Sequence, residues 1–209
     1  MREIEYFYSA HSAYAYLGSA RFMDIAAKAN CVIVHKPYDF NKGIAGVGST
    51  DTRTRPQNHR AYYFGREIER WAEYRNAPVV VGMPTYHWND MTTANCLIIA
   101  TGGRGADADA LAHAMLQAHW RDDADLADEK TLESLINGVG LDAAALLSAA
   151  RGADTLAKYE ANTRKAIERS VFGSPTYFVD GDMFYGQDHL EMFERALRQP
   201  FSGNWPRTP

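Results

Sequence analysis

Cysteine is scarce in this chain of 209 residues, which contains only Cys31 and Cys96. Two cysteines this far apart in the sequence form neither a CxxC redox pair nor a framework of several disulfides. They also fall short of the cluster of thiolates that holds a structural zinc ion. The sequence therefore excludes several kinds of redox and metal chemistry at once.

An excess of positive charge and long apolar runs are also missing. The 22 lysines and arginines stand against 26 aspartates and glutamates, a formal net charge of −4, so no basic field attracts nucleic acid or an anionic membrane. The apolar stretch Cys96–Ala100 is far shorter than the roughly 20 residues that span a bilayer. The charged start of the chain, residues 1–5, is unlike a signal peptide. We expect a cytoplasmic protein that binds neither nucleic acid nor membranes.

The first part of the chain has the pattern of a strand, a helix and a second strand. Residues Glu3–Tyr8 alternate and are rich in aromatic and β-branched side chains, and Cys31–His35 is short and β-branched, as is typical of strands. Between them, apolar residues recur at three to five positions from Ser12 onward, which indicates an amphipathic helix with Ser12 as its N-cap. A β-α-β unit of this length predicts two parallel strands.

A helical block and a hairpin follow. Helix-forming residues dominate in five segments: from about Asn58 to Asn76, Ala94–Ala100, Ala106–Arg121, Glu129–Asn137 and Asp142–Arg169. An Asp-Gly pair within residues 175–186 predicts a β-hairpin, and a last helix is expected from about Asp188 to Arg198. Since neither end of the chain can cover a sheet face alone, we predict an α/β protein with a split thioredoxin-like domain, residues 1–36 and 171–209, and an inserted helical domain, residues 37–170.

Several segments in this order resemble one known family. They are residues 7–17 (FYSAHSAYAYL), 66–72 (REIERWA), 118–120 (AHW), 125–128 (DLAD), 171–176 (VFGSPT) and 183–190 (MFYGQDHL). Together they span almost the whole chain. The sequence resembles 2-hydroxychromene-2-carboxylate isomerase and its relatives, the kappa-class glutathione transferases, in the DsbA-like branch of the thioredoxin superfamily. The resemblance implies a thioredoxin-like fold with a large helical insertion.

The resemblance also implies a glutathione site. In the family, a serine after the first strand faces the glutathione sulfur, and Ser12 holds that place. The bond before Pro175 is expected to be cis, with the backbone of Ser174 pairing with the cysteinyl part of glutathione. The remaining expected contacts are Asp188 with its neighbour Gln187 at the γ-glutamyl end, and Arg60 at the glycyl carboxylate.

A serine at a helix N-terminus is chemically suited to this role. A free thiol has a pKa of about 8.5 and reacts as the thiolate. The helix dipole contributes ~0.3–1 kcal/mol and a hydroxyl hydrogen bond to an anion roughly 1.5–3 kcal/mol, which together lower a thiol pKa by about 1–3 units. Ser12 would then donate a hydrogen bond to the thiolate instead of attacking the substrate itself. Taken alone, Ser12 is better explained as an ordinary N-cap, a role that is compatible with that of a hydrogen-bond donor.

The sequence departs from the family pattern around this serine. Residues 9–11 and Ala13 stand where relatives have an acidic residue, an aromatic residue and a proline, and residues 53–55, Arg-Thr-Arg, stand where relatives have an asparagine that contacts glutathione. These differences leave the identity of the second substrate open. Five aromatic residues are candidates for a wall against an aromatic substrate: Tyr14, Tyr16, Trp71, Trp88 and Trp120.

Seven histidines are present, and His11 is the one adjacent to Ser12, where it could assist proton transfer. His113 and His119 lie six positions apart, on different faces of a helix, and no other pair has the spacing of metal ligands. We predict no metal site.

The predicted function is that of a glutathione-dependent isomerase of a small aromatic acid, with glutathione as cofactor and a homodimeric assembly by family analogy. A kappa-like glutathione transferase or peroxidase is the first alternative. A DsbA-type thiol oxidoreductase or a non-catalytic glutathione-binding protein also stays open. The first of these is disfavoured because residues 12–15 are Ser-Ala-Tyr-Ala instead of CxxC.

Overall fold

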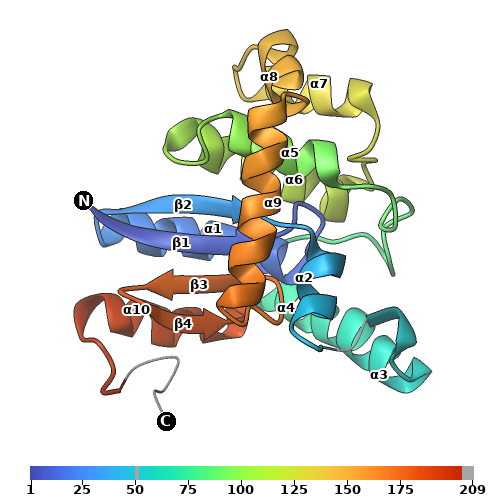
Figure 1. Ribbon diagram of the computed structural model, residues 1–209. Coiled ribbons are helices and arrows are strands. Elements are labelled where there is room, and N and C mark those ends of the chain that lie inside the picture. Colours follow the sequence, from blue (N-terminus) through green and yellow to red (C-terminus); the bar gives the residue numbers. More distant parts are fainter. Residues whose placement is uncertain (50–51, 204–209) are drawn as a thin grey trace.

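The computed structural model describes residues 1–49 and 52–203, and a four-stranded mixed sheet lies at its centre (Figure 1). The strands are β1 (Arg2–Tyr8), β2 (Cys31–Pro37), β3 (Thr176–Val179) and β4 (Asp182–Tyr185), in the order β2-β1-β3-β4. Strands β1 and β2 are parallel, whereas β3 is antiparallel to both β1 and β4. The two ends of the chain thus share one sheet, which confirms the predicted thioredoxin-like α/β fold.

The helices surround this sheet. They are α1 (Ala13–Lys28), α2 (Phe40–Gly46), α3 (Gln57–Ala61), α4 (Glu67–Arg75), α5 (Thr92–Ala100), α6 (Ala106–Asp122), α7 (Glu129–Gly138), α8 (Ala143–Ala150), α9 (Ala153–Glu168) and α10 (Leu190–Arg198). Short 3-10 turns cover Thr52–Thr54 and Gln187–His189, and a π-helical turn covers Tyr62–Arg66.

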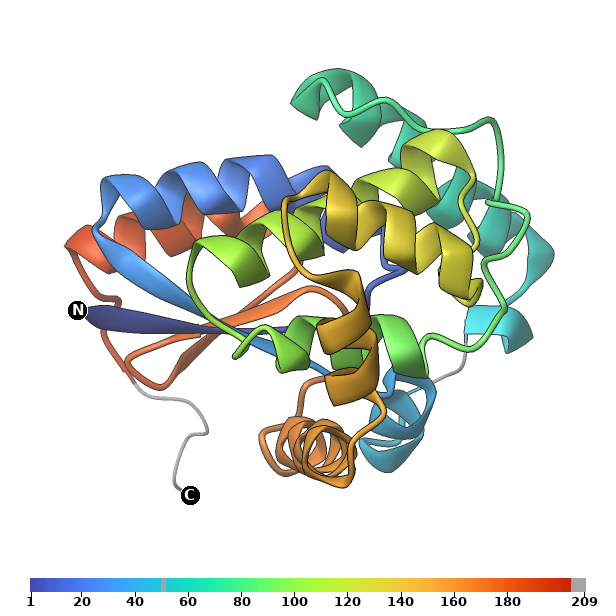
Figure 2. The same ribbon diagram turned by 90° about the horizontal axis from the view of Figure 1, so that it is seen from above.

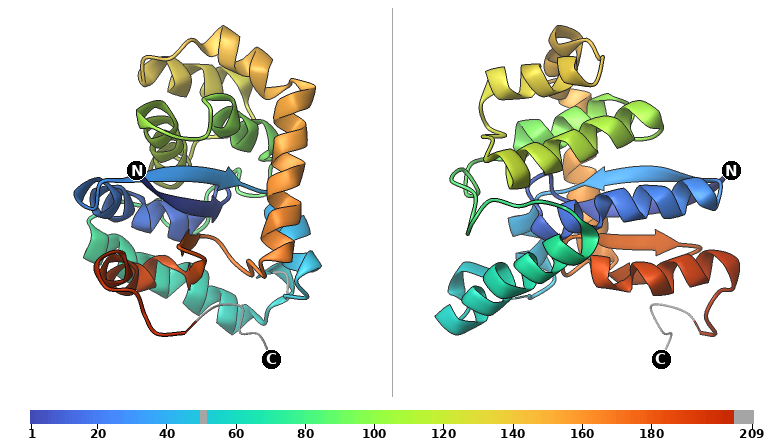
Figure 3. Two further views of the ribbon diagram at one scale, coloured as in Figure 1. Left: turned by 60° about the vertical axis from the view of Figure 1, so that its left-hand side comes forward. Right: turned by 180° about the vertical axis from the view of Figure 1, so that it is seen from behind.

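Three layers are visible when the molecule is turned. Helices α1 and α10 cover one face of the sheet, and α9 runs across the opposite face (Figure 2 and the left view of Figure 3). Helices α5 to α8 continue beyond the β2 edge, whereas α3 and α4 lie toward the other edge (Figure 1). No helix in the described part of the chain is long and apolar enough to cross a membrane.

Local signals explain most element ends. The predicted cap at Ser12 is confirmed, and Asp128 and Asp142 likewise accept a backbone hydrogen bond at the start of α7 and α8. The hairpin turn also forms as predicted, with Asp180 and Gly181 both at positive φ, the conformation that a two-residue turn of type I′ requires.

The helices differ from the predicted segments in two places. The segment 142–169 is two helices, α8 and α9, because the chain turns at Gly152, which is the N-cap of α9. Helix α2 was not predicted, although Asp39 caps it by accepting a hydrogen bond from the backbone N–H of Lys42 (3.1 Å). That aspartate was the available signal, but seven residues rich in glycine have weak helix propensity.

One apolar cluster links the sheet to the helices around it. It includes Ile4 of β1, Phe22 of α1 and Phe193 of α10 on the sheet side, and it continues through Leu97 of α5 to Leu132 of α7. A sheet face buries little surface alone, so this shared core fixes the helices relative to the strands. The division into a thioredoxin-like domain and an inserted domain stays a prediction.

Gly18 allows the closest approach between α1 and the segment before α10. A Cβ at Gly18 would lie 2.5 Å from the Cβ of Gln187. We expect Gly18→Ala to lower the free energy of unfolding by about 1–3 kcal/mol because the two elements would have to separate, as measured by urea denaturation. Gly138→Ala in α7 is the matched control, since nothing lies within 4 Å of its Cβ position, and it should be neutral or stabilising by up to about 1 kcal/mol. Equal effects at both positions would contradict this account.

Candidate active site

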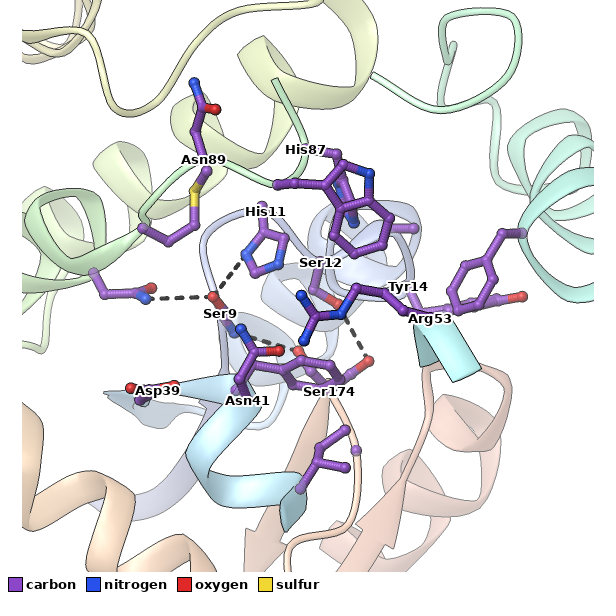
Figure 4. Close-up of a pocket in the computed structure, with 18 of the residues that line it drawn as sticks. Ser9, His11, Ser12, Tyr14, Asp39, Asn41, Arg53, His87, Asn89 and Ser174 are labelled. Carbon is purple, nitrogen blue, oxygen red and sulfur yellow. Dashed lines mark hydrogen bonds between the residues drawn. The ribbon is translucent and has the colours of Figure 1, made fainter. Parts of the chain in front are cut away.

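A pocket of about 340 Å³ opens where three segments far apart in the sequence meet (Figure 4). Residues 9–14 follow β1, residues 39–44 follow β2, and residues 172–174 precede β3. Because β1 and β2 are parallel, their carboxyl ends lie at the same edge of the sheet, and the segments after them converge there. Residues 87–92 also line the pocket.

Ser12 lies at the floor of this pocket and caps α1. Its Oγ accepts a hydrogen bond from the N–H of Ala15 (3.3 Å) and donates one to the carbonyl oxygen of Ser174 (3.2 Å). The N–H groups of Ala13 and Tyr14 have no acceptor among the described residues, and both residues line the pocket. A 16-residue helix therefore directs free N–H groups and the positive end of its dipole toward the cavity.

The segment before β3 lies directly beside Ser12. The Ser174–Pro175 bond is cis, as predicted. Ser174 Oγ accepts a hydrogen bond from the backbone N–H of Ser9 (3.3 Å), and the carbonyl oxygen of Pro175 accepts one from Gly186 (2.9 Å). Gly173 lies against the ring of Tyr185, in a space that a Cβ would fill. Ser174 is thus tied through Ser9 to the end of β1, and the next residue, Pro175, is tied through Gly186 to the end of β4.

Of the predicted site residues, Ser12 and Ser174 line the pocket, whereas Pro175 and the remaining three, Gln187, Asp188 and Arg60, lie outside its lining. Gln187 is buried, its Oε1 accepts a hydrogen bond from Arg75 (3.1 Å), and its Nε2 has no partner among the described residues. Asp188 is about half exposed beside His189. Arg60 is exposed on α3. Their roles in binding glutathione stay predictions.

Two arginines that were not predicted as ligands line the pocket instead. They are Arg53 and Arg55, in the segment where the family asparagine is missing. The Arg55 guanidinium lies over the ring of Tyr63, 5.7 Å from its centroid. Of the five aromatic candidates, Tyr14, Trp88 and Trp120 line the pocket, whereas Tyr16 and Trp71 do not. The sequence signal for the two arginine ligands was the pair Arg53 and Arg55 itself, because guanidinium groups suit carboxylate binding.

A buried hydrogen-bonded chain supports the floor beside Ser12. The side chain of Asn95, on α5, accepts a hydrogen bond from the N–H of Ala10 (2.9 Å) and donates to Ser9 Oγ (3.3 Å) and to the hydroxyl of Tyr159 (3.2 Å). Ser9 Oγ also lies 2.9 Å from Nδ1 of His11. These contacts fix residues 9–11 relative to α5, which carries Asn95, and α9, which carries Tyr159.

Three histidines from distant segments gather on one side of the pocket. The ring of His11 lies 4.9 Å from that of His87 and 6.3 Å from that of His119, centroid to centroid. Removal from water and the neighbouring imidazoles lower the pKa of His11 well below its usual value, and burial beside His119 lowers the pKa of His87 to about 3. Burial also lowers the pKa of His119. All three rings are neutral at neutral pH, and the described residues contain no cluster of three side chains suited to a metal ion.

Comparisons with known proteins agree with this fold. The family model described as DSBA-like thioredoxin domain matches residues 3–198. The chain is 28% identical to 2-hydroxychromene-2-carboxylate isomerase of Sphingobium xenophagum, over 94% of this chain and 98% of that one. It is 26% identical to the protein of the same name from Pseudomonas sp. (strain C18), over 93% and 89%. A solved structure of a 2-hydroxychromene-2-carboxylate isomerase superposes with a TM-score of 0.78 at 23% identity, covering 94% of this chain and 95% of that one.

The neutral histidines predict a loss of stability in acid. His87 is protonated below about pH 6.5 in the unfolded chain but only near pH 3 in the folded one. Its contribution to stability is therefore complete above pH 6.5 and is lost as the pH falls, by about 1.4 kcal/mol per pH unit. His87→Gln should reduce the slope of the unfolding free energy against pH between pH 6 and 4 by about 1.4 kcal/mol per pH unit, which corresponds to one proton. Urea denaturation at each pH measures this slope. His59→Gln, at an exposed position on α3, should leave the slope unchanged; an equal change in both variants would disprove the assignment.

Proposed function

We propose that this chain, which belongs to the DSBA-like thioredoxin domain family, is a glutathione-dependent isomerase of a small aromatic acid of the 2-hydroxychromene-2-carboxylate type. The observation that carries the proposal is the Ser12 hydroxyl at the N-terminus of α1, which lines the pocket at the place where a redox relative has a cysteine. The names of the curated relatives, which match over more than nine tenths of this chain, support the isomerase reaction.

The residues around Ser12 suit a tripeptide thiol. Two free N–H groups, of Ala13 and Tyr14, and the hydroxyl of Ser12 face the region that would receive the sulfur. The guanidinium of Arg55 lines the same pocket and matches the charge of a peptide carboxylate. When bound, glutathione would supply a thiolate nucleophile that adds to the conjugated substrate and is later expelled, so that no net oxidation occurs.

Ser12 would act by redirecting its hydroxyl hydrogen bond from Ser174 to the thiolate. In the free site that proton is donated to the carbonyl oxygen of Ser174, while the same oxygen atom of Ser12 caps Ala15. Rotation about the C–O bond redirects the proton toward a thiolate without disturbing the cap. A hydrogen bond to a charged group contributes about 1.5–3 kcal/mol, and the donor is already fixed in position, so little reorganisation is needed.

Aromatic side chains in the same pocket suit the aromatic substrate. Phe40, Trp88 and Trp120 line it together with the neutral rings of His11 and His87. Such a wall of flat apolar rings with a few fixed polar atoms is typical of sites for small organic ligands. A cytoplasmic location and a homodimeric assembly are parts of the same proposal.

Replacing Ser12 tests both of its roles. We expect Ser12→Ala to raise the pKa of the bound glutathione thiol by about 1–2 units and to lower kcat by roughly tenfold to a hundredfold, with thiolate absorbance and initial rates as the measurements. Loss of the cap should cost about 1 kcal/mol of stability as well. Ser12→Thr keeps both hydroxyl and cap and should retain most of the rate. A rate unaffected in Ser12→Ala would exclude the proposed role.

Accounting for glutathione distinguishes this activity from its alternatives. Calorimetric titration should detect glutathione binding, and glutathione should be recovered unchanged after many turnovers of 2-hydroxychromene-2-carboxylate. Consumption of glutathione in proportion to product would indicate a transferase or a peroxidase. Reduction of insulin disulfides would indicate an oxidoreductase. Absence of binding at millimolar glutathione would overturn the assignment of the site.

A further inference from the structure

The histidines beside the pocket have fixed hydrogen-bond directions. Nδ1 of His119 lies 3.1 Å from the carbonyl oxygen of Ala124, and because a carbonyl oxygen only accepts, this nitrogen carries the proton. Nε2 of the neutral His119 is then an acceptor. It lies 3.1 Å from Nδ1 of His87, so His87 donates from Nδ1, and its Nε2 is left without a proton.

The orientation of His11 follows from a different chain of contacts. The Asn95 amide is oriented by the N–H of Ala10, which donates to its Oδ1, so its nitrogen donates to Ser9 Oγ. No other acceptor for the Ser9 hydroxyl proton lies among the described residues, so the arrangement that uses this proton donates it to Nδ1 of His11, at 2.9 Å. Nδ1 of the neutral His11 accepts, and its Nε2 carries the proton.

Both Nε2 atoms are available to a ligand. Neither makes a hydrogen bond with a described residue. Neither is among the buried side-chain atoms without a hydrogen-bond partner, so both keep some access to the cavity. His11 and His87 line the pocket with their ring centroids 4.9 Å apart, and Figure 4 shows both above Ser9 and Ser12. One wall therefore presents an N–H donor beside a bare nitrogen acceptor.

We infer that His11 and His87 form the polar subsite for the second substrate, and that this subsite selects a hydroxyl group beside a carboxylate. The carboxylate oxygen accepts from Nε2–H of His11, while the hydroxyl donates to Nε2 of His87. A simple carboxylate has acceptors only and cannot donate to Nε2 of His87. That nitrogen would then lack a hydrogen-bond partner in a site partly removed from water, which is unfavourable. Ser9 and His119 are positioning residues, because each sets the tautomer of a neighbouring ring.

The position of the subsite favours an aromatic hydroxy acid. The ring of Phe40 lies edge-on to His11, with centroids 6.4 Å apart, and Trp88 lies edge-on to His87 at 4.9 Å. Both line the same pocket, so an aromatic ring attached to the hydroxy-acid group finds apolar surface beside the two imidazoles. This inference rests on the proposed function for its substrate class, but it does not depend on the fate of glutathione.

Three matched acids test the subsite in the presence of glutathione. Mandelate carries the hydroxyl beside the carboxylate, α-methoxyphenylacetate carries a methyl ether there, and phenylacetate lacks the oxygen. We expect mandelate to bind at least tenfold more tightly than either of the others, as measured by calorimetry, because only its hydroxyl can donate to His87. Equal affinity of the three acids for the unmodified protein would overturn the inference.

Substitutions assign the preference to the two rings. His87→Phe should bind the three acids with nearly equal affinity, and His11→Phe should weaken all three by about tenfold or more. His113→Phe is the control, since His113 is bonded to Ser19 and lies outside the pocket lining, and it should keep the preference for mandelate. Persistence of the full preference in His87→Phe would overturn the inference.

Two further measurements keep the test independent of folding and of the proposed function. The ¹⁵N shifts of the unmodified protein should show a proton on Nε2 of His11 and on Nδ1 of His87, and the opposite tautomer at either ring would overturn the subsite even if a variant failed to fold. Glutathione titration of the His87→Phe protein should be unchanged. If glutathione fails to bind the unmodified protein while the mandelate preference stands, the proposed function fails and the subsite remains.

Discussion

The candidate site depends on two hydrogen bonds that join opposite ends of the chain. Ser9 donates its backbone N–H to the Ser174 side chain, and Ser12 donates its hydroxyl to the Ser174 backbone. These bonds tie the turn between β1 and α1 to the segment before β3. The sheet brings the two segments near each other because β1 lies between β2 and β3, and the serine contacts then hold the N-terminus of α1 against Ser174. The position of Ser12 at the pocket floor follows from this contact.

How much the sequence could predict depends on how local the signal is. The strands, the Ser12 cap and the hairpin turn at Asp180 were predictable because each needs only neighbouring residues. The cis bond at Pro175 came from the family resemblance and is confirmed. The pocket arginines were not predicted as ligands, because the resemblance directed attention to Arg60 on α3. The histidine cluster was missed for a different reason: spacing tests compare residues on one element, whereas His11, His87 and His119 come from three separate segments.

The two cysteines acquire a clearer meaning in the folded protein. Burial raises the pKa of Cys96 to about 11, and partial burial raises that of Cys31 as well. A thiol with a raised pKa is a poor nucleophile at neutral pH. Cys96 lies in the core and Cys31 at the far end of β2 from the pocket, and neither lines the pocket. The chain thus places a hydroxyl donor and free N–H groups at the position where its own sulfur is missing, which is the arrangement a thiol ligand would need.

The neutrality of the histidines then limits how the proposed thiolate is stabilised. An imidazolium beside a thiolate forms an ion pair that lowers the thiol pKa strongly, yet nucleophilicity falls together with the pKa. His11 directly precedes Ser12, and a positive charge on its ring would act on the same sulfur. Burial and the nearby rings of His87 and His119 keep His11 uncharged, so the Ser12 hydroxyl and the N-terminus of α1, with its free N–H groups and dipole, would stabilise the anion without an imidazolium. Their modest contribution favours a thiolate that forms at neutral pH, remains reactive and can leave again, as a reaction that returns its thiol unchanged requires.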